Sequence, residues 1–310
     1  MKDSIIKCVD VSKRYREKAA DALSHISFEI REGECVGLVG PNGSGKTTLI
    51  SIVSGVLSPS SGAVQVFGVP PLQDRMRLNR LIGVHQPSSS IEPRARVEEV
   101  LQFHAAFYDR ALGVAEVLAM IGLEKKRTAY YGDLSAGQRQ RLLIALAFLH
   151  DPKLLLLDEP ANALDLQSQA VVNSLFADMR QQSKTMLLSS HDLTKLGALC
   201  DRVLVLDGGR IIEQGPPAEL IAKHAPCSRI ALEFARPLAA EVLTEVLTRA
   251  DCTDVTRSGQ RIEVLSRAPE RTLATIFDAV VRNGAQIQTA NIRPATLADV
   301  YLKLTGKNLE

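Results

Sequence analysis

The chain has 310 residues, of which 45% are hydrophobic and 23% are charged, and its formal net charge is +2. This composition is that of a folded globular protein with a sizeable core, and the length fits one large domain with a smaller one, or two domains. The nearly balanced charge creates no strong electrostatic field that would favour nucleic acid over other partners.

Five cysteines are present, and no two have the C-x-x-C spacing of a metal or redox motif. An odd number without such spacing argues against a disulfide framework and fits a reducing cytosol. No signal peptide is expected behind Met1, and the longest apolar run, residues 142–149, is far shorter than the roughly 20 residues that span a bilayer. A role at a membrane would therefore require a partner chain.

The first predicted elements are two strands, over residues 5–11 and 23–30. Tyr15 lies between them. Such a residue is most often a packed aromatic at the edge of a sheet, but a flat ring close to a nucleotide site can also stack on an adenine base. Both interpretations of Tyr15 stay open at this point.

Residues 40–47 match the P-loop pattern G-x-x-x-x-G-K-[ST] at every required position. A short apolar run, residues 34–39, predicts a buried strand before the loop, and residues 48–53 predict the start of a helix after it. In this context backbone N–H groups and the helix N-terminus surround an anion. The loop consists of Gly40, Pro41, Asn42, Gly43, Ser44, Gly45, Lys46 and Thr47.

These residues predict a nucleotide triphosphate site with Mg²⁺. Lys46 would contact the β- and γ-phosphates, the Thr47 hydroxyl would bind Mg²⁺, and Thr48 would lie near the α-phosphate. The alternative is a glycine-rich turn that binds nothing, which is rare when every position of the pattern is matched between a strand and a helix.

The next segments alternate between short strands and helices. Strands are predicted over residues 63–67 and 80–86, and the second of them ends on the polar Gln86. Apolar residues then recur at helical spacing over residues 97–108 and 114–121. This pattern predicts a helical insertion, at about 87–150, within an α/β domain.

A long helix is predicted after Leu134. Ser135 and Gln138 satisfy the capping-box pattern S-x-x-[EQ], and the apolar run that follows is nearly continuous around the helix. The helix should therefore be buried and should end before Pro152. By itself, Ser135 is a helix cap that contributes about 1 kcal/mol of stability.

Two acidic residues, Asp158 and Glu159, directly follow the four leucines of residues 154–157. A fully apolar run predicts a central parallel strand, and ligands of such sheets bind at the carboxyl ends of the strands. Asp158 could hold Mg²⁺ there, and Glu159 could activate the attacking water. Two acids after a strand are more often a solvated turn, but rarely so when the chain also carries a P-loop.

A similar strand, residues 185–190, ends in polar residues before His191. A lone histidine is usually an ordinary surface or core residue, but this one ends a strand at the same expected edge as Glu159. Residues 202–206 and 210–213 are predicted to form a hairpin through Asp207, Gly208 and Gly209, and a short helix follows over 218–222.

The composition changes near Ala225, where we place a domain boundary. The segment after it predicts the order β-α-β-β-α-β, which is that of a small ferredoxin-like unit, followed by a terminal helix. The expected elements are strands over 229–234, 253–257, 261–265 and 286–292, and helices over 238–248, 270–282 and 296–304. No chemistry is expected in this part.

Several motifs together resemble those of the nucleotide-binding subunits of ATP-binding cassette (ABC) transporters, over residues 1 to about 222. Residues 40–48 match the Walker A loop, residues 134–138 resemble the ABC signature, and residues 154–158 match Walker B. Ala163, Leu164 and Asp165 resemble the D-loop. The signature departs from the family by one residue, because Ala136 stands where glycine is usual.

The resemblance implies the fold and the roles of the site residues. The expected fold is a P-loop NTPase core with an antiparallel β subdomain and a helical insertion, over residues 1–224, with a small α+β domain over 225–310. Glu159 would be the catalytic glutamate, Gln86 the Q-loop glutamine at the metal, His191 the switch histidine and Tyr15 the adenine-stacking aromatic.

The resemblance also implies a mechanism and partners. Two copies would enclose two ATP molecules, each site combining the P-loop of one copy with Ser135, Gly137 and Gln138 of the other. ATP hydrolysis would drive a separate transmembrane permease, from a peripheral position on the cytoplasmic side of the membrane. The helical insertion would contact that permease near residues 87–93.

The end of the chain, residues 296–306, resembles that of exporter subunits of the drug-resistance and ABC-2 type. We therefore expect an export ATPase that works with an ABC-2 type permease and not with nucleic acid. One alternative is a soluble ABC protein that acts on ribosomes or DNA, although this chain has a single cassette and no heptad repeat. The other is the ATPase of an uptake system.

Overall fold

The computed structural model describes residues 3–16, 20–86, 91–162, 164–190, 193–237 and 252–307. These residues form two compact units, one that reaches to Pro217 and one that begins at Ala218. Helix α8, Pro217–His224, falls almost entirely in the second unit although it precedes the boundary expected near Ala225. The helix expected over 238–248 lies outside the described residues.

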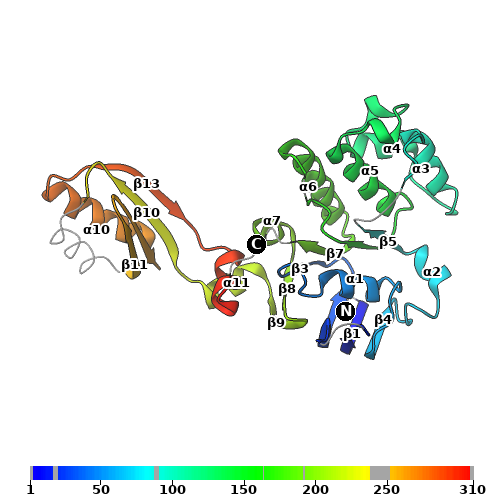
Figure 1. Cartoon of the computed structure of the whole chain (residues 1–310), viewed down its shortest axis with the longest axis horizontal. Coiled ribbons are helices and arrows are strands. Elements are labelled where there is room, and N and C mark those ends of the chain that lie inside the picture. The colour runs from blue at the N-terminus through cyan, green and yellow to red at the C-terminus, as the bar shows by residue number, and fades with distance from the viewer. Residues whose placement is uncertain are drawn as a thin grey trace. The chain divides into compact units, whose positions relative to one another are not determined.

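Six strands form the central sheet of the first unit, in the order β5-β6-β7-β3-β8-β9 (Figure 1). They are Ile82–His85 (β5), Leu154–Leu157 (β6), Thr185–Ser190 (β7), Cys35–Val39 (β3), Arg202–Asp207 (β8) and Arg210–Gly215 (β9). The first five run parallel, and β9 pairs antiparallel with β8 as the predicted hairpin. All four leucines of β6 are buried, as expected for a strand inside a parallel sheet.

A second sheet of the first unit is antiparallel and has three strands, in the order β2-β1-β4. Its strands are Ser4–Lys13 (β1), Leu23–Arg31 (β2) and Ser61–Val66 (β4). The predicted alternation in β2 is confirmed, because Leu23, Ile26, Phe28 and Ile30 are buried while the residues between them are more exposed. One face of this sheet therefore packs on the core, and the other faces solvent.

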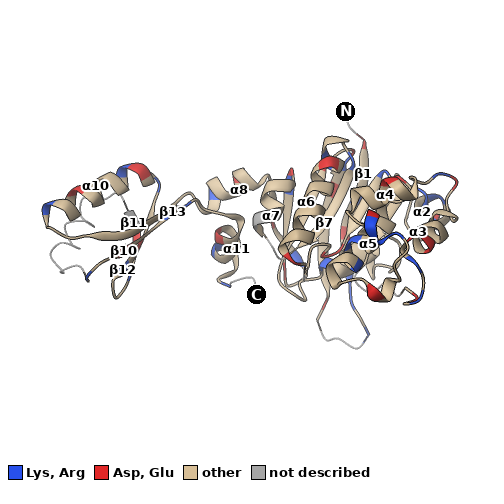
Figure 2. Cartoon of the chain, turned by 90° about the horizontal axis from the view of Figure 1, so that it is seen from above, with Lys and Arg blue, Asp and Glu red and all other residues tan. Residues whose placement is uncertain are grey.

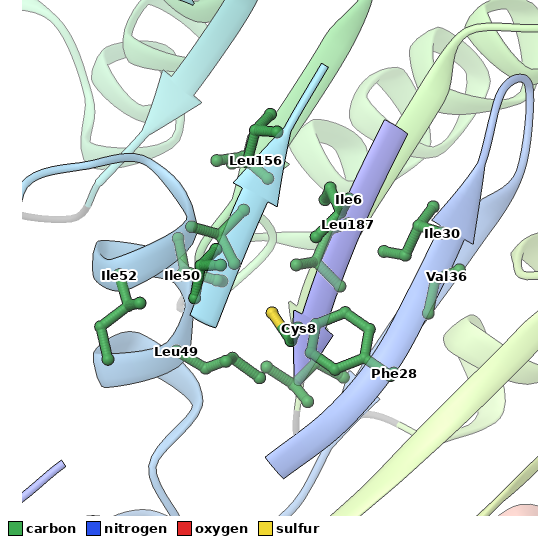
Figure 3. Close-up of a cluster of buried hydrophobic side chains, with 14 of the residues drawn as sticks. Ile6, Cys8, Phe28, Ile30, Val36, Leu49, Ile50, Ile52, Leu156 and Leu187 are labelled. Carbon is green, nitrogen blue, oxygen red and sulfur yellow. The ribbon is translucent and has the colours of Figure 1, made fainter. Parts of the chain in front are cut away.

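The main hydrophobic core of the first unit lies where these two sheets and helix α1, Lys46–Val53, come together. Figure 3 shows buried side chains of β1 and β2 directed toward those of α1, β3, β6 and β7. Ile6, Ile30 and Leu49 in this cluster are fully buried. Each such side chain contributes about 1.5–3 kcal/mol. The helix that follows the P-loop is thus anchored on its apolar face.

Helices α2, α6 and α7 of the first unit were not predicted. They span Arg75–Asn79, Leu166–Gln181 and Leu193–Leu199. The signal for α6 was nevertheless present, because Val172, Leu175, Phe176 and Met179 recur at helical spacing and are buried. The other two helices are only five and seven residues long, too short for a clear apolar period.

From residue 91 onward, the predicted helical insertion contains three α-helices and two short 3₁₀ turns. They are Val97–Ala105 (α3), Val114–Met120 (α4), Ala136–Phe148 (α5), Glu124–Lys126 and Tyr131–Asp133. Helix α3 ends three residues before the predicted end at Tyr108, and these last residues form turns. The carbonyl oxygen of Ala147 on α5 would lie 1.8 Å from a Cβ atom at Gly83, so α5 packs very closely on β5.

The second unit has a four-stranded antiparallel sheet in the order β11-β12-β10-β13. Its elements after α8 are Ser228–Phe234 (β10), Cys252–Ser258 (β11), Arg261–Ser266 (β12), Pro269–Arg282 (α10), Ile287–Arg293 (β13) and Leu297–Thr305 (α11). Ile230, Leu232 and Phe234 pack with Ile276 and Val280 of α10 in a separate core. The predicted ferredoxin-like strand order is therefore present in the described residues.

Basic and acidic residues are interspersed over both units (Figure 2). This distribution agrees with the near balance of 37 Lys and Arg residues against 35 Asp and Glu residues. The site described next is therefore built from local contacts and not from a large field of one sign.

Candidate nucleotide-binding site

Several of the predicted site residues lie at one edge of the central sheet. Gln86 follows β5, Asp158 follows β6, and Gly40 follows β3. These strands and β7 are neighbours and run parallel, so their carboxyl ends meet at the same edge. His191, which would follow β7, lies outside the described residues.

The P-loop has the glycine geometry that its pattern requires. Gly43 and Gly45 have φ angles of 81° and 109°. At Gly40 an added Cβ would lie 2.2 Å from the carbonyl oxygen of Leu206. Side chains at these positions would cause strain or a clash, so the loop can close into a phosphate-binding turn only with glycine.

Lys46 opens helix α1 and points back over the loop. Its side chain is only 6% exposed, and Nζ donates hydrogen bonds to the carbonyl oxygens of Gly40, at 2.8 Å, and Pro41, at 3.2 Å. Nζ also lies 3.4 Å from Oε1 of Glu159. The ammonium group of the loop and the acid after β6 therefore face the same space.

Glu159 itself adopts an unusual backbone conformation. Its φ angle is 46°, in the left-handed region that residues other than glycine rarely occupy. Such a conformation costs on the order of 1–3 kcal/mol and is most common at functional sites. Its backbone N–H donates to Oγ of Ser189 at 2.8 Å, which helps to hold this turn.

Asp158 is 1% exposed, and Ser189 on β7 supplies a hydrogen bond to its buried carboxylate. The Ser189 hydroxyl donates a hydrogen bond to Oδ1 of Asp158 at 2.5 Å while it accepts the one from Glu159. The polar end of this strand was predicted, but Ser189 was not predicted as a site residue. Its signal was a small hydroxyl residue two positions before the predicted His191.

A pocket of about 180 Å³ lies over the loop. It is lined by Tyr15, Ala22, Asn42, Gly43, Gly45, Lys46, Thr47, Thr48 and Glu159. The hydroxyl of Tyr15 lies 3.3 Å from Oγ1 of Thr48, at hydrogen-bond distance, and its ring is partly exposed. Tyr15 is thus placed beside the loop, and not packed into the sheet edge.

The signature segment forms the N-terminus of α5. Ser135 is the N-cap, with the backbone N–H of Gln138 donating to Oγ at 3.2 Å and Ser135 N–H donating to Oε1 of Gln138 at 3.0 Å. The predicted capping box is confirmed. Ser135, Gly137 and Gln138 are not among the described residues that line the pocket over the P-loop.

Asp165 lies beside the signature segment, at the N-cap of α6. The backbone N–H of Ser168 donates to its carboxylate at 2.7 Å and lowers the pKa of that carboxyl. A Cβ at Gly137 would lie 2.4 Å from Oγ of Ser168 and 3.2 Å from Oδ2 of Asp165. Glycine at 137 is therefore required for the close approach of α5 and α6.

Gln86 is half-buried at the end of β5, directly after the buried His85. Burial lowers the pKa of the His85 imidazole, so the neutral ring is favoured. His85 was not singled out from the sequence, because a histidine at the end of a short strand has no distinctive spacing.

The fold and the site together define a class of protein. A phosphate loop between strand and helix, with two carboxylates at the end of another parallel strand of the same sheet, is the arrangement of a P-loop ATPase.

Comparisons with known proteins narrow this class. The ABC transporter family matches residues 23–162. Nod factor export ATP-binding protein I of Rhizobium etli is 34% identical over 307 residues, which cover 97% of this chain and 93% of that protein. The chain therefore belongs to the ABC transporter family, as an ATP-binding subunit, and it is an ATPase.

Solved structures of the same kind share the fold. The ATP-binding subunit of an ABC transporter gives a TM-score of 0.63 at 26% identity, over 71% of this chain and 92% of that one. A dimeric ATP-binding cassette in a post-hydrolysis state, bound to ADP and Pi, gives a TM-score of 0.62 at 26% identity, over 68% of this chain and 98% of that one.

We expect Ser189→Ala to lower the free energy of unfolding by about 1–3 kcal/mol, because it removes the partner of the buried Asp158 carboxylate and of the Glu159 N–H. Urea unfolding of the purified chain measures this loss. Ser54→Ala is the control, since the Ser54 hydroxyl makes a single neutral hydrogen bond to the Ser51 carbonyl oxygen. Equal losses in the two variants would contradict the special role of Ser189.

Proposed function

We propose that this chain is the ATP-binding and ATP-hydrolysing subunit of an exporter and that it powers export through a separate transmembrane permease. The observation that carries the ATPase part is the approach of Lys46 to Glu159, 3.4 Å apart, where the phosphate loop meets the acid after β6. The similarity to an export ATP-binding protein over 97% of the chain supports the export part.

In this proposal the pocket over the P-loop holds ATP. Lys46 neutralises the β- and γ-phosphates, and Thr48 lies near the α-phosphate. Tyr15 stacks on adenine, which its position beside Thr48 supports. The backbone of Gly40, Pro41, Asn42, Gly43, Ser44 and Gly45 surrounds the phosphates.

The residues at this edge also suit Mg²⁺, because Thr47, Gln86 and Asp158 all offer oxygen ligands. No cluster of three or more His, Cys, Asp or Glu residues that could hold a metal ion occurs among the described residues. This agrees with Mg²⁺, which is usually held by one or two protein groups together with the phosphates. When bound, the ion would neutralise charge on the phosphates.

Glu159 is the proposed catalytic base. Its carboxylate lies beside Lys46, at the place expected for the γ-phosphate end of the nucleotide, and it can orient the attacking water and accept its proton. Gln86, at the same edge, is assigned a supporting role on the basis of the family resemblance, and so is His191. The 14% exposure of the Glu159 side chain leaves it accessible from the pocket.

The proposed site is completed by a second copy of the chain. Ser135, Gly137 and Gln138 are assigned to the γ-phosphate held by the other copy, and Asp165 to the dimer contact. Among the described residues, the signature residues do not line the pocket over the P-loop. This supports a site that is divided between two copies of the chain. The dimeric cassette that shares this fold gives it further support.

The permease is proposed to bind the helical insertion. On α3, Phe103 is 63% exposed, and Phe107 just beyond it is 68% exposed. Their rings pack edge to face with centroids 5.1 Å apart, which makes a preformed apolar anchor. The described residues contain no helix that is long and apolar enough to span a bilayer. The proposed location is peripheral, on the cytoplasmic side of the membrane.

Residues 225–310 are proposed to be an accessory domain to the ATPase of residues 1–224. Of the alternatives, action on ribosomes or DNA would be indicated by co-purification of ribosomes or nucleic acid in place of a membrane protein. An uptake system would be indicated by the direction of transport in vesicles.

We expect Glu159→Gln to reduce ATP turnover by about 100-fold or more, because it removes the general base. ATP binding should be retained, since Lys46 and the loop are unchanged. Steady-state phosphate release and nucleotide binding measure the two properties, with Glu32→Gln as a control on the exposed surface. Turnover of Glu159→Gln at the wild-type rate would show that Glu159 is not the base.

Ser135→Arg should abolish ATP-dependent dimers without changing nucleotide binding by a single chain, because Ser135 contacts only the nucleotide of the other copy. Sedimentation with and without ATP, in the Glu159→Gln background, measures the dimer. Ser135→Ala is the matched control, because it removes the same helix cap without adding bulk or charge. Comparison of the two variants separates the loss of the cap from the effect of the added bulk and charge. Loss of nucleotide binding in the monomer would refute the two-copy site.

Replacing the aromatic pair, with Phe103→Ser and Phe107→Ser together, should release the permease while ATP hydrolysis by the purified chain is unchanged. Co-purification of a polytopic membrane protein with the tagged chain measures the contact. Val56→Ser is the control, because Val56 is 64% exposed but follows α1, outside the insertion. If the double variant retains the membrane protein, the permease does not bind at these rings.

A further inference from the structure

His85 ends β5, directly before Gln86, and is only 1% exposed. Its ring Nε2 lies 3.1 Å from the side-chain Nε2 of Gln140. The other ring nitrogen, Nδ1, is buried and has no hydrogen-bond partner among the described residues. Among the described residues, the contact with Gln140 is therefore the hydrogen bond that pairs this buried imidazole.

The direction of this hydrogen bond follows from a second contact of the same amide. Gln140 Nε2 also donates to the carbonyl oxygen of Pro160 at 3.0 Å. A side-chain amide has two N–H hydrogens, so one is directed to Pro160 and the other to His85. Nε2 of His85 is therefore the acceptor, and the proton of the neutral ring is on Nδ1.

Three segments of the site meet at this amide. His85 is the residue before Gln86, and Pro160 is the residue after Glu159. Gln140 lies on α5, two residues beyond the signature segment at the N-terminus of that helix. The Gln140 side chain thus joins α5, whose N-terminus would face the second copy, to the segments that carry Gln86 and Glu159.

Two further contacts make this junction firm. The backbone N–H of Asp158 donates to the carbonyl oxygen of His85 at 3.2 Å. At the other end of β5, the Ala147 carbonyl oxygen of α5 packs directly against Gly83. A Cβ atom added at Gly83 would lie only 1.8 Å from this oxygen. Helix α5 is therefore held on β5 at two points, near its start by Gln140 and near its end by Ala147.

We propose that His85 is a positioning residue for ATP hydrolysis. Its Nε2 holds the amide of Gln140, and that amide holds Pro160. Glu159 is thereby kept in a defined place relative to α5, and contact of the signature segment with a second copy is transmitted to the catalytic carboxylate. This inference rests on the proposed function, in which Glu159 is the base.

The test separates the hydrogen bond from the bulk of the ring. In His85→Gln the side-chain amide reaches the place of Nε2 and can still accept from Gln140, whereas in His85→Asn it reaches only the place of Nδ1. Gln140→Ala removes the link from the other side and retains a good helix former. Turnover and KM for ATP with Mg²⁺ are measured on the full chain, together with thermal unfolding.

We expect kcat of His85→Asn and of Gln140→Ala to fall roughly tenfold, the effect of losing about one neutral hydrogen bond that positions the base. KM for ATP should stay within about twofold, because the P-loop is unchanged. His85→Gln should restore turnover to within about twofold of wild type. His85→Asn added to Gln140→Ala should cause no further loss, since both remove the same link.

Wild-type kcat in a folded His85→Asn, or equal losses in His85→Asn and His85→Gln, would overturn the inference. If His85→Asn does not fold, Gln140→Ala decides, and wild-type kcat in that variant would overturn it as well. Glu159→Gln in the same assay distinguishes the two proposals. Wild-type turnover in Glu159→Gln refutes the proposed function, whereas an effect of Glu159→Gln without an effect at His85 refutes only the positioning role.

Discussion

The constraint on which the site depends is that β5, β6, β7 and β3 are neighbours and run parallel. Their carboxyl ends must then meet at one edge, so segments far apart in the chain deliver Gln86, Glu159, Ser189 and the P-loop to one place. Parallel strands need crossover connections, and both faces of such a sheet are buried; here the antiparallel sheet packs with α1 and the central strands in the main core. Burial of both faces explains why these strands are apolar runs, and the shared edge explains why polar residues follow them.

The second feature of the site is that its charges are held in a largely buried environment. Asp158 and Lys46 are 1% and 6% exposed, and each is satisfied by named partners. Removing a partner from a buried charge is costly, whereas the same contact at the surface would contribute little. The site is therefore preorganised by short contacts among its own residues, which is the condition for electrostatic catalysis.

The helical insertion connects this preorganised edge to the surfaces proposed for the partners. Helix α5 carries the signature segment at its start and packs closely on β5 near its end. Helix α3 presents the exposed rings of Phe103 and Phe107. Helix α5 thus connects the catalytic edge to the proposed interface with a second copy, and it lies in the same insertion as the rings proposed to contact the permease. This arrangement offers a physical route by which ATP hydrolysis can act on a neighbouring protein.

Local patterns predicted much of the molecule. The P-loop, the buried leucine strand with its two acids, the capping box at Ser135 and the strands of the second unit all agree with the structure. Each depends on residues close together in the sequence, through glycine conformation, apolar period or helix capping. The amphipathic period of α6 is equally clear in the sequence, although this helix was not predicted. Helices α2 and α7 are too short to show such a period.

The sequence by itself determined the chemistry that is available, namely a lysine in a glycine loop, carboxylates after an apolar strand, and a capped helix with a glycine at 137. Tertiary structure alone decided that Ser189 would satisfy Asp158, that Lys46 would face Glu159, and that Gln140 would join His85 to Pro160. The residues of these pairs are 31, 113, 55 and 20 positions apart in the sequence. No local period encodes contacts over such separations, because they are set by strand order and by the packing of α5 on the sheet.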